Sequence, residues 1–164
     1  MRLLNITTII SGVLLSFASF AQQKQAPPQE PGCNDANVHS TLVAIDANYE
    51  NQGYNLAVFE TMPMASGVIT PVYIKMEQGK LYQVNFVANP DFQQFSLVII
   101  DKDKNKLLEQ KIKNKGQKEH FISQNFIAPY SGNFLIAVSQ KLKTGKEACA
   151  GVSVLKAGEA PEAK

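Results

Sequence analysis

Residues 68–88 have the sequence VITPVYIKMEQGKLYQVNFVA. Polar and apolar side chains alternate through both halves, and the β-branched and aromatic residues in them fit a pleated sheet. Between the halves, Gln78-Gly79-Lys80 has the composition of a turn. The pattern predicts two strands, at residues 68–76 and 80–88, joined by that turn.

The same alternation recurs, bounded by turn residues, at residues 54–59, 95–101, 107–113, 121–128, 133–140 and 148–155. Eight short strands without helices between them favour an antiparallel arrangement over a parallel sheet. We therefore predict a mainly β fold, an antiparallel β-sandwich of jelly-roll type.

A helical period precedes the strands. Apolar residues recur at intervals of four, three and four positions, at Val38, Leu42, Ile45 and Tyr49. Asn34 or Asp35 can cap the start of such a helix, and Gly53 follows its end. We predict one amphipathic α-helix of about 15 residues that stops near Asn51, within a single domain over residues 33–156.

Residues 1–21 have the features of a cleavable signal peptide: a basic start at Arg2, an apolar run, and Ser19-Phe20-Ala21 before the expected cut. They predict an exported protein, periplasmic or extracellular, with no lipid anchor at the cut and no transmembrane segment after cleavage. The polar, proline-rich residues 22–32 are predicted to be a disordered spacer, and residues 157–164 a disordered tail.

Cys33 and Cys149 are the two cysteines of the sequence. In an oxidising compartment such a pair is first interpreted as a disulfide, here one that joins the N-terminal element to the last strand. A redox or nucleophilic cysteine would need a basic neighbour at a helix start or a nearby second thiol, and the sequence indicates neither.

The net charge argues against nucleic acid as a partner. The formal charge is +2 for the whole chain, and Arg2 is its one arginine. Loss of residues 1–21 would leave a charge near +1 and no guanidinium for bidentate capture of phosphate or for reading a guanine edge. We therefore expect no nucleic-acid binding.

Three segments resemble repeats of the bacterial pre-peptidase C-terminal domain. They are residues 78–84 (QGKLYQV), residues 95–103 (FSLVIIDKD) and residues 126–138 (FIAPYSGNFLIAV). The resemblance covers residues 68–140 and implies an accessory β-sandwich without catalysis of its own, of the kind found beside secreted peptidases. This chain differs in carrying a helix, a cysteine pair and no attached peptidase.

The sequence predicts neither a catalytic nor a metal site. His39 and His120 stand apart from any serine–histidine–acid or G-x-S-x-G pattern, so packing or surface positions are expected for them. Residues 101–105 imitate the start of a calcium loop, but Lys106 occupies the position of its glycine and Ile112 that of its glutamate. We expect a polar turn there, no enzyme activity, no metal and no cofactor.

Seven lysines lie between Lys102 and Lys118. Lysines protect the edges of sheets from pairing, and this interpretation comes first. The functional alternative is contact with an anionic polymer, through Lys111, Lys113 and Lys115.

Tyr54 and Tyr130 fall near element ends and are the aromatic candidates for ligand contact, although such residues more often close the end of a core. Tyr73 and Tyr82 alternate with apolar residues and are predicted to be structural.

We therefore expect a non-catalytic binding or accessory module of the bacterial cell envelope, with an envelope protein or an anionic or neutral glycan as partner. A carbohydrate-binding protein is the alternative, and a hydrolase comes after it.

The signal peptide predicts the mass of the exported protein. Intact-mass measurement should give a chain that starts near Gln22, because Ser19-Phe20-Ala21 places small residues at the third and first positions before the cut. Replacing Ala21 by a bulky residue should leave an uncleaved precursor. An exported protein that retains residues 1–21 would contradict the assignment.

Overall fold

The computed structural model describes residues 33–116 and 119–158. The elements are α1 (Ala36–Glu50), β1 (Tyr54–Ala65), β2 (Ile69–Met76), β3 (Leu81–Val87), β4 (Phe92–Ile100), β5 (Lys106–Lys113), β6 (Phe121–Ile127), β7 (Gly132–Leu142) and β8 (Glu147–Ala157). The predicted signal peptide and spacer, and residues 159–164 of the predicted tail, lie outside the described residues.

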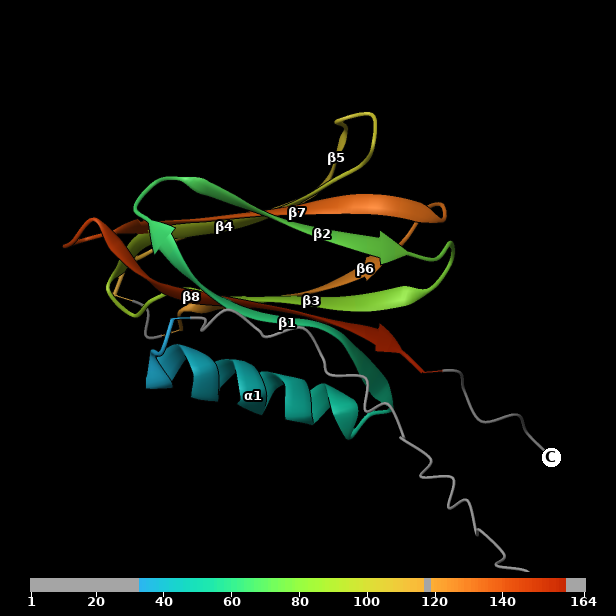
Figure 1. Ribbon diagram of the computed structural model, residues 1–164, viewed down its shortest axis with the longest axis horizontal. Coiled ribbons are helices and arrows are strands. Elements are labelled where there is room, and N and C mark those ends of the chain that lie inside the picture. The colour runs from blue at the N-terminus through green and yellow to red at the C-terminus, as the bar shows by residue number, and fades with distance from the viewer. Residues whose placement is uncertain (1–32, 117–118, 159–164) are drawn as a thin grey trace, which may run out of the picture.

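The strands form two antiparallel sheets (Figure 1). Sheet A has the order β1-β8-β3-β6 and sheet B the order β2-β7-β4-β5. Pairing follows one rule: β4 pairs with β5, β3 with β6, β2 with β7 and β1 with β8. This is the pairing of one long hairpin with its tip at the β4–β5 turn. When such a hairpin folds over on itself, it gives the strand order of a jelly roll. The predicted sandwich with one helix is confirmed.

The predicted elements are all present, and their ends differ by a few residues. The largest difference is β1, which continues to Ala65, six residues past the predicted end. Alternation weakens there because β1 is an edge strand, where Pro63 is tolerated. Ala157 belongs to β8, and the Gly158 amide donates to the Gly53 carbonyl, so the folded part includes both residues.

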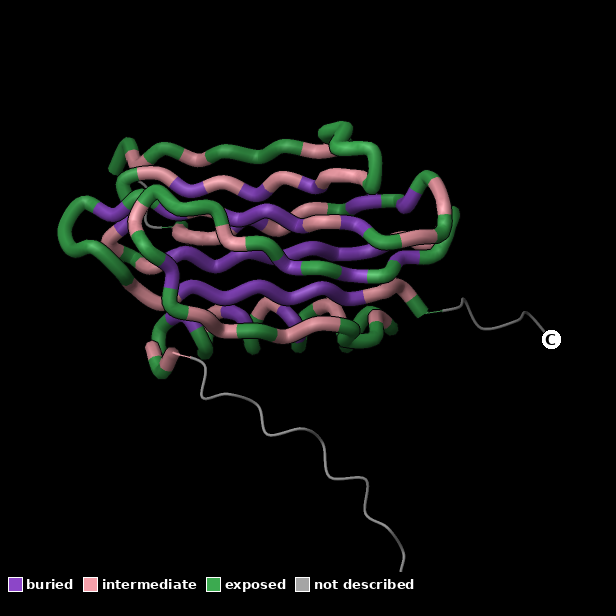
Figure 2. The backbone as a smooth tube through the Cα atoms, turned by 45° about the horizontal axis from the view of Figure 1, so that its top comes forward, coloured by how far each residue is buried: buried purple, intermediate pink, exposed green. Residues whose placement is uncertain are grey.

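The main core lies between the two sheets and is built from inward-facing side chains of both. Its largest fully buried members are phenylalanines: Phe86, Phe92, Phe95 and Phe134. The Phe92 and Phe95 rings meet edge to face at 4.7 Å between centroids. Buried positions run along the central strands, as Figure 2 shows in purple.

A second, smaller cluster fixes α1 to the outer face of sheet A. Val38 and Leu42 are fully buried there with Val87. Gly151 of β8 lies directly beneath them, and a Cβ at that position would meet Leu42 at 3.0 Å and Val38 at 3.2 Å. The glycine therefore allows the helix to lie close against the sheet.

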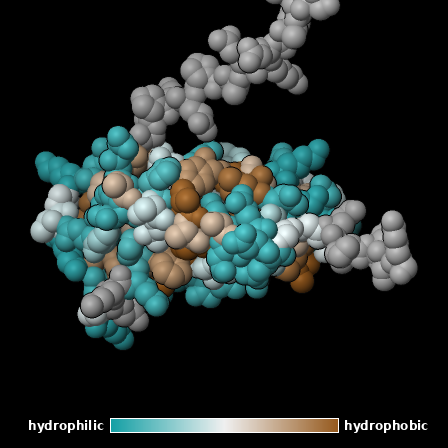
Figure 3. Space-filling model, turned by 90° about the horizontal axis from the view of Figure 1, so that it is seen from below, coloured by the Kyte–Doolittle hydropathy of each residue, from teal (hydrophilic) through white to brown (hydrophobic). Residues whose placement is uncertain are grey.

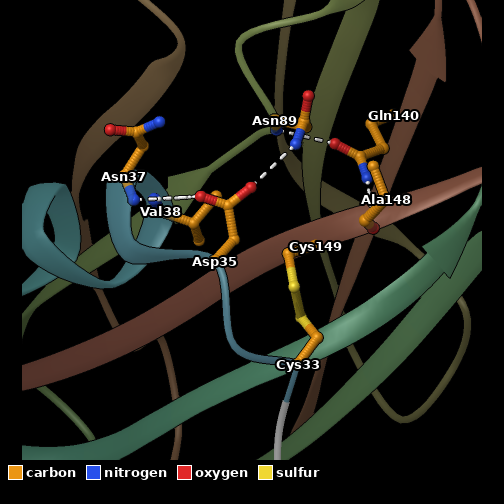
Figure 4. Close-up of a disulfide and its surroundings, with 8 residues drawn as sticks. All are labelled: Cys33, Asp35, Asn37, Val38, Asn89, Gln140, Ala148 and Cys149. Atoms are coloured by element: carbon orange, nitrogen blue, oxygen red, sulfur yellow. Dashed lines mark hydrogen bonds between the residues drawn. A yellow bond between two sulfur atoms is a disulfide. The ribbon is translucent and has the colours of Figure 1, made fainter.

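A disulfide and a set of hydrogen bonds hold the start of α1 (Figure 4). The predicted disulfide is present and joins Cys33 to Cys149 of β8. Asp35 is the N-cap: its Oδ1 accepts from the Asn37 and Val38 amides, and its Oδ2 accepts from Asn89 Nδ2 at 3.1 Å. The helix start is thus bound to both β8 and the β3–β4 connection.

Loss of the disulfide should destabilise the fold. The combined substitution Cys33→Ser and Cys149→Ser should lower the free energy of unfolding by about 2–5 kcal/mol, because the bond closes a long loop in the unfolded chain. Urea denaturation measures the difference, and reduced wild type is the control that should match the variant. Two free thiols in native, unreduced protein would contradict the assignment.

Candidate functional site

The two sheets are covered unequally on their outer sides. Helix α1 lies across sheet A, whereas no described element covers the outer face of sheet B. Seven outward side chains of β2, β7 and β4 are apolar: Ile69, Pro71, Tyr73, Val98, Ile100, Leu135 and Ala137. We call these seven residues the open face.

The register places six residues of the open face in two apolar rows, whereas Ile69 shares its row with Ser139 and Ser96, which are polar. Tyr73 of β2 is opposite Leu135 of β7, which is opposite Ile100 of β4. The next row is formed in the same way by Pro71, Ala137 and Val98. Tyr73 is 73% exposed and Ile69 67% exposed. A contiguous apolar surface of this kind, bordered by polar residues, is typical of an interaction site.

The prediction for Tyr73 was wrong. Tyr82 is buried in the core, and its hydroxyl accepts from the Glu77 amide at 2.9 Å. Tyr73, by contrast, points to solvent, because the buried residues of β2 are Val72, Ile74 and Met76. Alternation with apolar neighbours predicts a strand, but it does not identify which side of the strand faces the core.

Lysines border the open face. Lys75, Lys141, Lys111 and Lys113 are all exposed on the strands of sheet B. The nearest acid on β5, Glu109, forms an ion pair with Lys106. The Lys106 hydrogen bond, followed by its charge, lowers the pKa of Glu109, so this carboxyl stays ionised and paired. The free lysines of the border therefore lie at the two ends of the face, with Lys111, Lys113 and Lys141 at one end and Lys75 at the other.

The structure separates the predicted contact residues. Lys111 and Lys113 lie on β5, and Lys115 is exposed in the connection that follows. Tyr130 lies beside the other end of β5, where its hydroxyl accepts from the Lys102 amide at 3.3 Å, and its ring stacks on Phe134 at 4.9 Å.

Tyr54 is half-buried at the start of β1, and its ring packs edge to face against Tyr49 of α1 at 5.4 Å. Tyr130 thus packs against the main core, and Tyr54 packs against α1; the predicted ligand contact of either ring stays a prediction.

A hollow runs between α1 and β6. It has a volume of about 650 Å³ and is lined by Thr41, Ala44, Asn48 and Tyr49 of the helix and by Phe121 and Ser123 of β6. Figure 3 looks onto the face that carries α1, where hydrophobic side chains gather among hydrophilic ones. We call this hollow the α1–β6 groove.

Beneath the groove lies a buried polar network that the sequence analysis missed. Asp46 Oδ1 accepts hydrogen bonds from Ser153 and from Asn85, the latter at 3.1 Å. Ser123 donates to Asn85 at 2.7 Å and contacts the Tyr49 hydroxyl at 3.3 Å. Asp46 lies four residues after Leu42 and three before Tyr49, so the same helical spacing that identified the apolar face contained the signal.

Burial raises the pKa of Asp46, and the negative charge of Glu50 adds to the rise, while the hydrogen bonds from Ser153 and Asn85 oppose it. Its second oxygen, Oδ2, is buried without a hydrogen-bond partner in the described structure. The carboxyl therefore holds a proton more tightly in the folded state than in the unfolded chain.

The calcium-like segment forms a turn. The Asp101 carboxylate accepts from the amides of Asp103 and Asn105 and from the Asn105 side chain. The Asn105 hydrogen bond is the largest cause of the lowered pKa of Asp101. Within residues 33–116 and 119–158, no three His, Cys, Asp or Glu side chains come together as a group that could hold a metal ion.

No family model matches the chain, and no curated protein matches it either. The resemblance to the pre-peptidase C-terminal domain therefore stays a prediction. In the described part of the chain, no helix is both long enough and apolar enough to cross a membrane.

Asp46 makes the stability depend on pH in a defined direction. Because its pKa is higher in the folded state, its favourable contribution is complete at low pH and is lost as the pH rises above about 4, through the folded pKa. The free energy of unfolding of Asp46→Asn, measured by urea denaturation, should therefore rise relative to that of wild type between about pH 4 and pH 7.

Exposed carboxyls with lowered pKa, such as Asp91 hydrogen-bonded to Thr144, act in the opposite direction but equally in both proteins. Glu60→Gln, which changes an exposed carboxyl on β1, is the control and should give a much flatter difference. A constant offset between wild type and Asp46→Asn across this range would contradict the burial argument.

Proposed function

We propose that this protein is an exported, non-catalytic binding module of the bacterial cell envelope, and that it docks an envelope protein on the open face. The uncovered apolar surface of sheet B is the observation that carries the proposal. Helix α1 covers the outer face of sheet A, and none of the described elements covers that of sheet B, so a partner can bury it.

The border specifies the chemistry of the partner. Lys111, Lys113 and Lys141 lie at one end of the apolar rows and Lys75 at the other, while Glu109 is already paired with Lys106. A partner surface with an apolar centre and acidic residues at its two ends would complement this arrangement. Such contacts at the border set orientation and association rate more than affinity, and they weaken with salt.

The export part of the proposal is supported by the signal-like residues 1–21 and by the disulfide between Cys33 and Cys149, a bond that persists in oxidising compartments. The non-catalytic part is supported by the sequence, in which neither His39 nor His120 belongs to a nucleophile pattern. The proposed accessory role also agrees with the resemblance to the pre-peptidase C-terminal domain.

The exposed ring of Tyr73 is the observation that favours the second candidate, a glycan ligand, since an aromatic ring face can stack on a sugar. The other six residues of the open face are aliphatic, so Tyr73 is its one aromatic ring. A protein partner therefore fits the face better than a saccharide chain does.

Site-specific photocrosslinking tests the proposal. A benzophenone amino acid at Tyr73 should give one discrete adduct in cells that export the protein, whereas the same group at Glu60, an exposed position of sheet A, should not. Adding Lys111→Gln, Lys113→Gln and Lys115→Gln to the Tyr73 crosslinking variant should lower the yield of the adduct. The yield should then also depend less on salt.

The stability of that lysine variant should stay within about 0.5 kcal/mol of wild type, because these side chains face solvent. Digestion of the adduct with protease or glycosidase separates the two partner classes. Equal labelling from Tyr73 and Glu60, or none from Tyr73, would contradict docking on the open face.

A further inference from the structure

The two described sheets have four edges, and three of them carry residues that hinder pairing with another strand. The protective residues are Glu60 and Pro63 in β1, Pro71 and Lys75 in β2, and Lys106, Lys111 and Lys113 in β5. The fourth edge is β6, whose sequence FISQNFI contains neither a proline nor a charge. Proline and lysine are the usual means by which edge strands avoid pairing, so β6 is the edge open to it.

The backbone of β6 presents hydrogen-bonding groups outward in a regular order. The His120 carbonyl accepts a hydrogen bond from the Ala88 amide. Ala128 donates to the Lys80 carbonyl and accepts from the Gly79 amide. The backbone groups of residues 120 and 128 therefore point toward β3 and the loop before it. Direction alternates along a strand, so residues 121, 123, 125 and 127 direct theirs to the free edge. Consistent with this, the Asn125 carbonyl accepts a hydrogen bond at 3.4 Å from the side chain of Gln124.

The β6 sequence is complementary to itself when two copies run antiparallel about Gln124. Ser123 then faces Asn125 of the second copy, polar against polar. Phe121 faces Ile127 of the second copy, and Ile122 faces Phe126, apolar against apolar. All four outward-directed residues are paired with outward-directed residues in this register, which allows about eight main-chain hydrogen bonds across the edge.

The same register covers exposed apolar surface. Ile127 is 64% exposed, on the side of sheet A that carries α1. Phe121 lines the α1–β6 groove on that same side. A second copy would place its Ile127 beside Phe121, at the wall of the groove, and the two-fold axis would repeat the contact.

We propose that two copies of this chain associate through β6, joining their A sheets into one continuous eight-stranded sheet. The proposal goes beyond the binding function of the open face, which lies on the other sheet. The two-fold axis of the dimer is perpendicular to the shared sheet. Both open faces therefore lie on the same side of the dimer. The occupant of the edge is a second copy, and a peptide of another protein is an alternative outcome of the test.

Sedimentation equilibrium of the mature chain tests the proposal. Wild type should show a concentration-dependent doubling of mass below about 0.5 mM. Ile127→Lys should weaken the dimer about tenfold or more, because it brings a charge beside Phe121 of the second copy. Ile69→Lys is the matched control: it changes an equally exposed isoleucine on sheet B and should leave the dimer intact.

Asn125→Pro provides a second variant that leaves the monomer folded. Its amide points to the free edge and is not needed for pairing with β3, so proline should abolish the dimer, while Asn125→Ala should retain it. Circular dichroism checks that both variants are folded.

A wild-type chain that stays monomeric up to about 0.5 mM overturns the proposal. So does a dimer unaffected by Ile127→Lys and Asn125→Pro, or higher aggregates without a discrete dimer. Ile69→Lys should affect crosslinking from Tyr73 without affecting mass, so failure of dimerisation and failure of the proposed function are distinguishable.

Discussion

The position of β8 between β1 and β3 is the constraint on which the rest of the structure depends. This one strand carries Cys149, which receives the disulfide, Gly151, over which α1 packs, and Ser153, which binds Asp46. It is also the last strand, whereas α1 and β1 precede all others. The helix, the first strand and the polar network can therefore reach their final places only after nearly the whole domain is present. Pairing over such sequence distances forms slowly, and the disulfide is the device that offsets the entropy of bringing these ends together.

The unequal covering of the two sheets follows from that arrangement. Sheet A carries polar side chains on its outer face, including Asn85 and Ser153, and these are satisfied largely by one another and by Asp46 of α1. Buried polar groups are costly unless paired, so this network favours one position of the helix over others that hydrophobic contact alone would allow. Sheet B has no such helix in the described chain. Its outer face is instead apolar in the middle and cationic at its two ends, a composition suited to a surface that becomes buried against something else.

The two proposed interactions use different chemistry on different parts of the molecule. The open face would bind through side chains, with Tyr73 and Ile69 at its most exposed positions, and β6 would bind through its main chain. The two surfaces lie on separate sheets and have no residue in common. A β6-linked dimer would present two open faces to one partner surface, and paired weak contacts can then act with an effective concentration that neither has alone. The lysines of β5 would serve in both contexts, protecting their own edge from pairing and attracting an acidic partner.

The sequence by itself determined the element types, the sandwich class, the helix cap candidate Asp35 and the cysteine pair, because alternation, helical spacing and cysteine count are local or compositional signals. It did not determine which side of β2 faces the core, so Tyr73 was assigned wrongly, and it did not reveal Asp46 as buried. The order of strands within each sheet, the open face and the unprotected state of β6 were likewise decided by tertiary structure. Each of these depends on which strand lies beside which, and pairing across the chain is set by the packing of the whole core rather than by any short segment.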